Sequence, residues 1–427
     1  MSRRMLFVLA VTCGVAVGNI YFPQALVPLI ATGLGTSSDG ATLAVSATQI
    51  GYAGGIFLLV PLGDRLPHRR LLLALLGLTG FGLLLAGCAR NLPLLVAGSV
   101  LVGLTTVGAQ VIGPLAAGLV EDHRRAAVLG TLLSGSVGGM ILARAFSGTL
   151  GEWFGWRVPY LAAAVLVFVL LAVLSRMLPY TSPRSREHYP SLLGESLRLL
   201  FTEPELRRSC LYQAAVFAGF SAVWTTLAIL LTGPVYGLGT SAVGLFALVG
   251  GVTACCTPLA GGWVDRQGPD PVNLVCMFGV LVSAAVLAGG AHGDRIGLLA
   301  LIIGTLLLDV AMQCGMVANQ ARVYALRPER RSRLNTAYMT CAYLGGSAGS
   351  WIGSHVYDLF GWSGVWVRGP AHHSGPAPPP ADAPCSKTGS GSLLGGGRLG
   401  NVPTATVNIR PARVHDAHAL GEIHVAS

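Results

Sequence analysis

The feature that most constrains this chain is a series of apolar segments, each long enough to cross a lipid bilayer as a helix, which takes about 20 residues. We predict eleven spans, at residues 5–30, 41–62, 71–89, 92–119, 126–150, 157–178, 209–233, 240–263, 271–291, 296–321 and 333–356. Of the 427 residues, 52% are hydrophobic and 11% are charged, whereas soluble domains carry about 25% charged residues. A soluble fold of this length cannot bury so much apolar surface. The sequence therefore predicts an all-α polytopic membrane protein.

The arginines predict how the spans are oriented. With the N-terminus in the cytoplasm, and the tail left out, the inner loops carry nineteen arginines and the outer loops carry three, Arg90, Arg157 and Arg295. Membrane proteins show this excess of positive charge on the cytoplasmic side. Loop anchors also account for the net charge of +10. We therefore expect the basic residues to meet the lipid bilayer and no nucleic acid.

The chain contains two similar halves. "GDRLPHRR" (Gly63–Arg70) follows the second span, and "GGWVDRQG" (Gly261–Gly268) follows the eighth. Gln110 of the fourth span and Gln313 of the tenth are separated by nearly the same offset as these loops. We assign an N-terminal six-span half to residues 1–178, a cytoplasmic linker to 179–208, a C-terminal half with five recognisable spans to 209–366, and a disordered or non-native tail to 367–427. Parallel repeats of this kind have their substrate site between the halves, near the bilayer midplane.

The two loops resemble a signature of the major facilitator superfamily, G-x-x-x-D-R/K-x-G-R-K/R, which follows the second span of those transporters. The residues that fit are Gly261, Asp265, Arg266 and Gly268 in the C-terminal copy, and Asp64, Arg65, Arg69 and Arg70 in the N-terminal copy. "GNIYFPQALVPLIA" in span one also resembles bacterial members, broadly the drug:proton antiporters. Over residues 5–366 the resemblance implies the family's fold of two six-span helical halves, secondary transport by alternating access, and a location in the bacterial inner membrane.

Asp64 and Asp265 are expected at cytoplasmic helix ends, each beside an arginine. A carboxylate there can cap the N-terminus of a neighbouring helix or pair with an arginine. A contact that forms in one conformation and breaks in the other acts as a gate. The alternative is a static loop charge that only sets topology.

Asp309 lies in the middle of the tenth span, within "GTLLLDVAMQCGM" (Gly304–Met316), where an ionisable group is costly and normally faces a partner or a cavity. Thr305, Asp309 and Gln313 are spaced i, i+4, i+8 and share one helix face. Arg144 lies in the outer part of the fifth span. We predict that Asp309 and Arg144 take part in proton coupling, because burial disfavours the charged form of a carboxyl group. The alternatives are an aspartate bonded permanently to a neighbouring helix and an arginine that anchors a helix contact.

Further polar residues at mid-span are candidates for a cavity that takes a mid-sized, partly polar small molecule. They are Asn19, Tyr21, Gln24, Gln49, Gln110, Trp224, Thr305 and Gln313. Each of them can instead join two helices through a hydrogen bond.

Residues 367–427 differ in character from the spans. Their first part is rich in Pro, Gly and Ser, at the point where a twelfth span is expected. The last part, "TATVNIRPARVHDAHALGEIHVAS", resembles the first strand and helix of a GNAT acetyltransferase. We interpret the tail as the product of a frameshift or gene fusion that removed the twelfth span. The alternative is a genuine eleven-span protein with a regulatory tail.

The motifs of catalysis and metal binding are missing from the sequence. No cysteine or histidine spacing typical of a metal site occurs, nor a phosphate-binding loop, so we expect neither an enzyme nor a cofactor. The leading hypothesis is a monomeric secondary transporter that is coupled to protons and exports a small molecule. The alternatives are uptake instead of export, and a membrane protein that does not transport, such as a sensor or an inactive truncated remnant.

Overall fold

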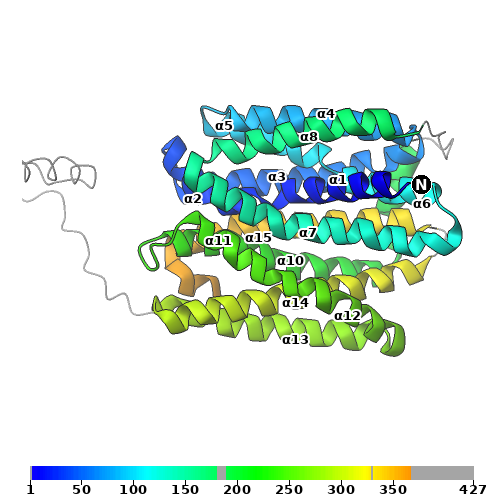
Figure 1. Cartoon of the computed structure of the whole chain (residues 1–427). Helices are drawn as coiled ribbons and strands as arrows, with labels where there is room; N and C mark the ends of the chain where they lie inside the picture. Colours follow the sequence, from blue (N-terminus) through cyan, green and yellow to red (C-terminus); the bar gives the residue numbers. More distant parts are fainter. Residues whose placement is uncertain (1, 180–188, 328–329, 367–427) are drawn as a thin grey trace, which may run out of the picture. The chain divides into compact units, whose positions relative to one another are not determined.

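The computed structural model describes residues 2–179, 189–327 and 330–366, all of them in helices and short connections. The tail, with its expected absence of a twelfth span and its resemblance to an acetyltransferase, lies outside the described residues. The helices of the N-terminal half are α1 (Arg3–Tyr21), α2 (Pro23–Leu34), α3 (Ser38–Leu59), η1 (Pro61–Asp64), α4 (His68–Gly87), α5 (Leu92–Thr105), α6 (Gly108–Gly118), α7 (Asp122–Phe154) and α8 (Arg157–Met177) (Figure 1).

The C-terminal half follows a helix of the linker. The elements are α9 (Tyr189–Thr202), α10 (Pro204–Thr232), α11 (Thr240–Val249), η2 (Gly250–Val252), α12 (Thr253–Gln267), α13 (Pro269–Ala288), η3 (Gly289–His292), α14 (Arg295–Leu326) and α15 (Arg331–Trp366). We call the end of the bundle that carries Arg69 and Arg322 the inner end. The end that carries Glu152 and Asp294 is the outer end, following the orientation that the arginines predict.

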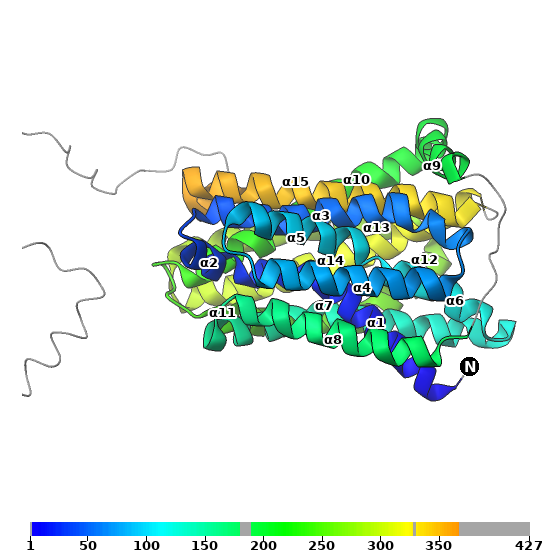
Figure 2. The same ribbon diagram turned by 90° about the horizontal axis from the view of Figure 1, so that it is seen from above.

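Nine of the described helical segments are long and apolar enough to cross a membrane. The eighth predicted span is not among them because η2 divides it into α11 and α12. The eleventh, α15, is long but rich in glycine, serine and alanine along the faces that meet α3 and α10. Figure 2 shows α15 running beside α3, a contact that joins the two halves.

The first predicted span is also two helices. Phe22 ends α1, Pro23 opens α2, and Pro28 lies inside α2. A proline lacks the N–H that would continue the helical ladder and crowds the preceding turn. The break therefore lies at the buried residues that the sequence offered as cavity candidates.

Two hydrophobic cores hold the halves together. A first core of buried aliphatic and aromatic side chains fills the N-terminal half. A second core lies around α10, α14 and α15 and extends across the interface to Tyr21, Tyr52 and Met140. Within the N-terminal half, α1 and α7 approach so closely that a side chain on Gly139 would meet the backbone of Gly14. That approach fixes the position of α7, which carries Arg144.

Candidate functional site

Arg144 and Asp309 lie in one buried cluster between the halves. Arg144 projects from α7 of the N-terminal half and is 1% exposed. Its Nε and Nη2 atoms donate to Oε1 of Gln24, at 3.0 and 2.8 Å. Gln24 lies in the first turns of α2, directly after the break in span one. The break therefore turns an amide oxygen toward the guanidinium.

Aromatic rings surround the Arg144 guanidinium. Its Cζ atom lies 4.1 Å from the centroid of the Trp224 ring, 5.0 Å from that of Tyr21 and 5.4 Å from that of Phe220. Phe220 and Trp224 are one turn apart on α10 and so present their rings on the same side. A cation over an aromatic face is attracted by the negative potential of the ring, and the attraction grows when water is excluded. The rings thus partly replace the water that Arg144 loses on burial.

Asp309 lies at the edge of the Trp224 ring. The indole Nε1–H of Trp224 donates to Oδ1 of Asp309 at 2.9 Å. The second carboxylate oxygen, Oδ2, packs against Gly250, where a Cβ atom would lie 2.6 Å away. Gly250 is the first residue of η2, so the break in span eight leaves room for the carboxylate. Among the described residues, Asp309 and Arg144 form no direct ion pair, although their charges interact across the cluster.

A polar network adjoins this cluster. The hydroxyl groups of Tyr21 and Tyr343 are 3.2 Å apart and join the two halves. Gln49 donates through Nε2 to Oγ of Ser221 at 2.7 Å, and this Oγ lies 2.8 Å from that of Ser350. These bonds link α3 of one half to α10 and α15 of the other. A relative movement of the halves must break them.

Among the described residues, the other cavity candidates form no hydrogen bond with Arg144 or Asp309, and most of them contact a different helix. Asn19 donates to Oγ1 of Thr106 at 3.3 Å, and Gln110 donates to the Tyr52 hydroxyl at 3.5 Å. Thr305 donates to the backbone of its own helix, and Gln313 lies with Nε2 at 3.8 Å from the sulfur of Met140. The face shared by Thr305, Asp309 and Gln313 is buried at all three positions. Of the eight candidates, Tyr21, Gln24 and Trp224 contact Arg144 or Asp309 directly.

The loops of the signature motif lie at the inner end. Arg69 donates to the backbone oxygen of Ser175 at 2.5 Å, whereas Arg65 and Arg70 are exposed. Asp64 closes η1, and its side chain is outside the described part. In the C-terminal copy Asp265 and Arg266 are exposed at the end of α12, and Gly268 has φ +83°, a conformation that favours glycine. Gly261 has space around it for a side chain.

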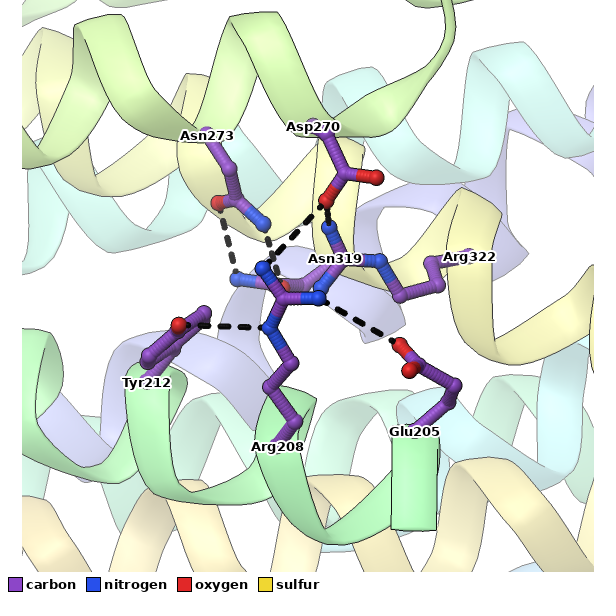
Figure 3. A network of polar contacts seen from close by, with 7 residues as sticks. All are labelled: Glu205, Arg208, Tyr212, Asp270, Asn273, Asn319 and Arg322. Atoms are coloured by element: carbon purple, nitrogen blue, oxygen red, sulfur yellow. Dashed lines mark hydrogen bonds and ion pairs between the residues drawn. The ribbon is translucent and has the colours of Figure 1, made fainter. Parts of the chain in front are cut away.

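Five residues after Asp265, a different carboxylate makes the inner-end contacts. Asp270, at the start of α13, pairs with Arg322 of α14 and lies 3.7 Å from Arg208 of α10 (Figure 3). Asn273 and Asn319 exchange amide hydrogen bonds of 2.7 and 3.1 Å beside this pair. The Arg322 side chain is 8% exposed, so the network holds a buried positive charge. This network could not be predicted from the sequence, because Asp270 falls between two predicted spans, where charged residues are common.

The two halves also contact each other at the outer end. Oε2 of Glu152, at the end of α7, accepts from the backbone N–H of Ser241 at 2.7 Å. Ser241 is in the first turn of α11, so a carboxylate of one half caps a helix of the other. Next to it, Thr240 donates through Oγ1 to the backbone oxygen of Gly148 at 2.9 Å. A side chain on Gly239 would collide with the Glu152 carboxylate.

An apolar groove of about 460 Å³ runs along α1, α7 and α8. Its walls include small residues of α1 and α7, such as Gly14, Gly18 and Gly138. Neither Arg144 nor Asp309 lines it. The groove lacks charged groups that could orient a polar molecule, so the buried cluster is the better candidate site.

Comparison with known proteins agrees with this architecture. The family model described as Major Facilitator Superfamily matches residues 7–300. The chain is 34% identical over 369 residues to the transporter YgaY of Escherichia coli (strain K12), covering 86% of this chain and 93% of that protein. It is 32% identical over 367 residues to a Streptomyces coelicolor protein named "Probable transporter SCO4007", covering 85% of this chain and 84% of the relative.

Solved structures share the fold at low sequence identity. The nucleoside transporter NupG aligns with a TM-score of 0.67 and 13% identity, over 86% of this chain and 95% of that one. A bacterial homologue of the human lysosomal transporter Spinster, in an inward-facing and unoccupied conformation, aligns with a TM-score of 0.63 and 17% identity, over 84% of both chains. The expected fold of two helical halves is thereby confirmed, and the chain belongs to the Major Facilitator Superfamily of membrane transporters.

Proposed function

We propose that this protein is a proton-coupled secondary transporter that exports a small molecule across the bacterial inner membrane as a monomer. The observation that carries the proposal is the Gln24–Arg144–Trp224–Asp309 cluster, which is buried and built from both halves. Family members work by moving two halves around a central site. A cluster with charged members from each half couples that movement to the charge of its members.

Asp309 is the group that we propose carries the proton. The titratable side chains that act on it in the described residues are Arg144 from α7 and Tyr21 from α1. While Arg144 lies across Trp224, its positive charge favours the ionised carboxylate. When the halves move and Arg144 withdraws, the buried carboxylate loses that compensation and binding of a proton becomes more favourable. Protonation and conformation thus influence each other reciprocally.

Contacts at the two ends serve as gates in this proposal. The Glu152–Ser241 contact favours a closed outer end, and it must break before the outer end opens. At the inner end we assign the gate to the signature loops, with Asp64 and Asp265 as the carboxylates that change partners. The Asp270–Arg322 pair lies wholly within the C-terminal half and joins the start of α13 to α14.

The test is gradient-driven transport by the full chain in proteoliposomes, with a pH gradient imposed and a panel of candidate substrates. Asp309→Asn should abolish transport against a gradient, because the amide keeps the size and hydrogen-bonding capacity of the side chain but cannot titrate. Asp294→Asn is the matched control on the same helix. Asp294 caps α14 by accepting from Gly297 N–H at 2.7 Å, and asparagine caps equally well.

Two results would contradict the role of Asp309 as the proton carrier. Gradient-driven accumulation by Asp309→Asn at the rate of the unsubstituted protein removes Asp309 from the mechanism. Equal losses in Asp309→Asn and Asp294→Asn point to damaged folding of α14 and also contradict the assigned role.

A further inference from the structure

We propose that the Arg144 guanidinium is a tethered stand-in for the transported molecule, and that the aromatic site it occupies binds an organic cation with a flat, delocalised charge. The proposal rests on the proposed function in one respect, the movement of the two halves. It adds the chemical class of the substrate and gives Arg144 the role of an internal competitor.

The aromatic rings of the site attract a cation. Three rings, those of Tyr21, Phe220 and Trp224, lie within 4.1 to 5.4 Å of the guanidinium carbon. The faces of aromatic rings carry negative potential and their edges positive potential. A flat cation is attracted by such faces, whereas an oxyanion in the same position is repelled by them. The carboxylate of Asp309 accepts a hydrogen bond from the indole N–H of Trp224 and holds the ring in place.

The residues of the site come from both halves. Phe220, Trp224 and Asp309 belong to α10 and α14 of the C-terminal half. Arg144 belongs to the N-terminal half and reaches across the interface into this aromatic site. When the halves separate here, Arg144 leaves together with its own helix, while the rings and the carboxylate of the other half stay together. The position of the guanidinium is then free for a molecule of similar charge and flatness.

Arg144 is held in a way that permits withdrawal. Its hydrogen bonds in the described residues go to one acceptor atom, Oε1 of Gln24, and that residue is on its own half. Leaving the site therefore breaks ring contacts and no ion pair. Arginine often pairs with a carboxylate through two parallel hydrogen bonds, whereas the hydrogen bonds of Arg144 in the described part of the chain go to the amide oxygen of Gln24.

When Arg144 has left, either a proton or an organic cation can neutralise Asp309. Without Arg144, the ionised Asp309 is a buried charge without compensation, which is costly. A proton can neutralise it, or an organic cation seated on Phe220 and Trp224 can do so. Both together would leave an excess positive charge in the same low-dielectric volume. Cation and proton therefore exclude each other, and this exclusion is the requirement for exchange transport.

Binding measured on the purified full chain in detergent tests the inference without any proton gradient. The probes are benzamidinium, neutral benzamide and anionic benzoate, which share one shape and differ in charge. We expect benzamidinium to bind at least tenfold more tightly than benzamide, with benzoate weaker still. Raising the pH should tighten benzamidinium binding, because fewer protons then compete for Asp309. Asp309→Asn should weaken benzamidinium binding at least tenfold and remove its pH dependence.

The Arg144 variants give the decisive result. Arg144→Met removes the resident charge while keeping an unbranched side chain, so benzamidinium should bind several-fold more tightly. Gln24→Leu leaves the charge but removes its anchor, and should shift the affinity in the same direction by less. The matched control is Arg157→Met, because Arg157 stacks on Trp156 at 4.3 Å, away from the site. It should leave the affinity unchanged, and gel filtration of all variants checks that they fold.

Three outcomes overturn the inference: tighter binding of benzoate that depends on Arg144, benzamidinium affinity that is the same in Asp309→Asn and Arg144→Met, or no binding of benzamidinium. The first result would assign the site to an anion that pairs with Arg144. Failure of proton-driven transport with benzamidinium binding intact would refute the proposed function and leave the cation site standing.

Discussion

Replacing Glu152 should shift the protein toward conformations that are open at the outer end. The Glu152 carboxylate accepts a hydrogen bond from Ser241 and faces the N-terminus of α11. Helix caps contribute about 1 kcal/mol when an acceptor is replaced by alanine. The charge alone contributes about 0.5 kcal/mol at an exposed, salt-screened position. Since about 1.4 kcal/mol is tenfold in an equilibrium constant, Glu152→Ala should raise the outer-open population about fivefold and Glu152→Gln about twofold.

Thiol labelling provides the assay. Ser46 bonds across the interface to the backbone of Ser347 and is buried. Ser46→Cys, in a background with the other cysteines replaced, should react with a membrane-impermeant maleimide only when the outer end opens. The labelling rate then follows the open population. It should rise about fivefold and twofold in the two Glu152 variants, and the twofold effect of the charge should vanish in high salt.

The control separates conformation from stability. Asp294 also caps a helix N-terminus, but within its own half, so Asp294→Ala should lower thermal stability and leave the labelling rate unchanged. Labelling of Glu152→Ala at the rate of the unsubstituted protein would refute the gating role of this contact. Equal labelling in Glu152→Ala and Asp294→Ala would refute the reasoning from the interface.

Three further predictions concern the rest of the transport machinery. Gly250→Ala should slow transport strongly because the added methyl lies 2.6 Å from a carboxylate oxygen, whereas Gly251→Ala, with open space at its Cβ, should be close to normal in the same flux assay. Asp270→Asn should lower the free energy of unfolding by about 2 kcal/mol, because it removes the negative charge that pairs with the buried Arg322 guanidinium. Adding Arg322→Met should restore much of that loss, as thermal melting in detergent would measure. Asp64→Asn should slow transport without lowering the melting temperature, and normal flux in this variant would remove Asp64 from the gate.

The sequence indicated the fold and the two central charges for one physical reason. Charges are so costly in lipid that Asp309 and Arg144 stand out against their apolar spans. Gln24 and Trp224 were also candidates because polar atoms at membrane depth need partners. Phe220 was missed, because an aromatic residue in an apolar helix normally belongs to the hydrophobic core. Gly250 was missed because a glycine reveals its importance only through the atom that approaches it.

Other gaps have different causes. Glu152 gave no signal because charges are common at span ends, and only the packing of α7 on α11 gives it a partner in the other half. The linker helix α9 could have been recognised from Leu192, Ser196 and Leu199, which are buried and lie on one face. The length of the polar segment between the halves favoured a loop instead. The break in span eight has no proline at its position, at Gly250–Val252, so the sequence did not predict it.

The linker helix α9 also limits how far the inner end can swing. Tyr189, at its start, donates to the backbone oxygen of Leu58 at 2.5 Å on the N-terminal side. Glu195, two turns on, pairs with Arg330 at 2.7 Å and Arg333 at 3.3 Å on the C-terminal side. The helix thus contacts both halves across their interface. A large separation of the halves at this end must break one of these contacts, and the ion pairs weaken as the salt concentration rises. Ionic strength at the inner end of the bundle should therefore change how far the two halves swing apart there.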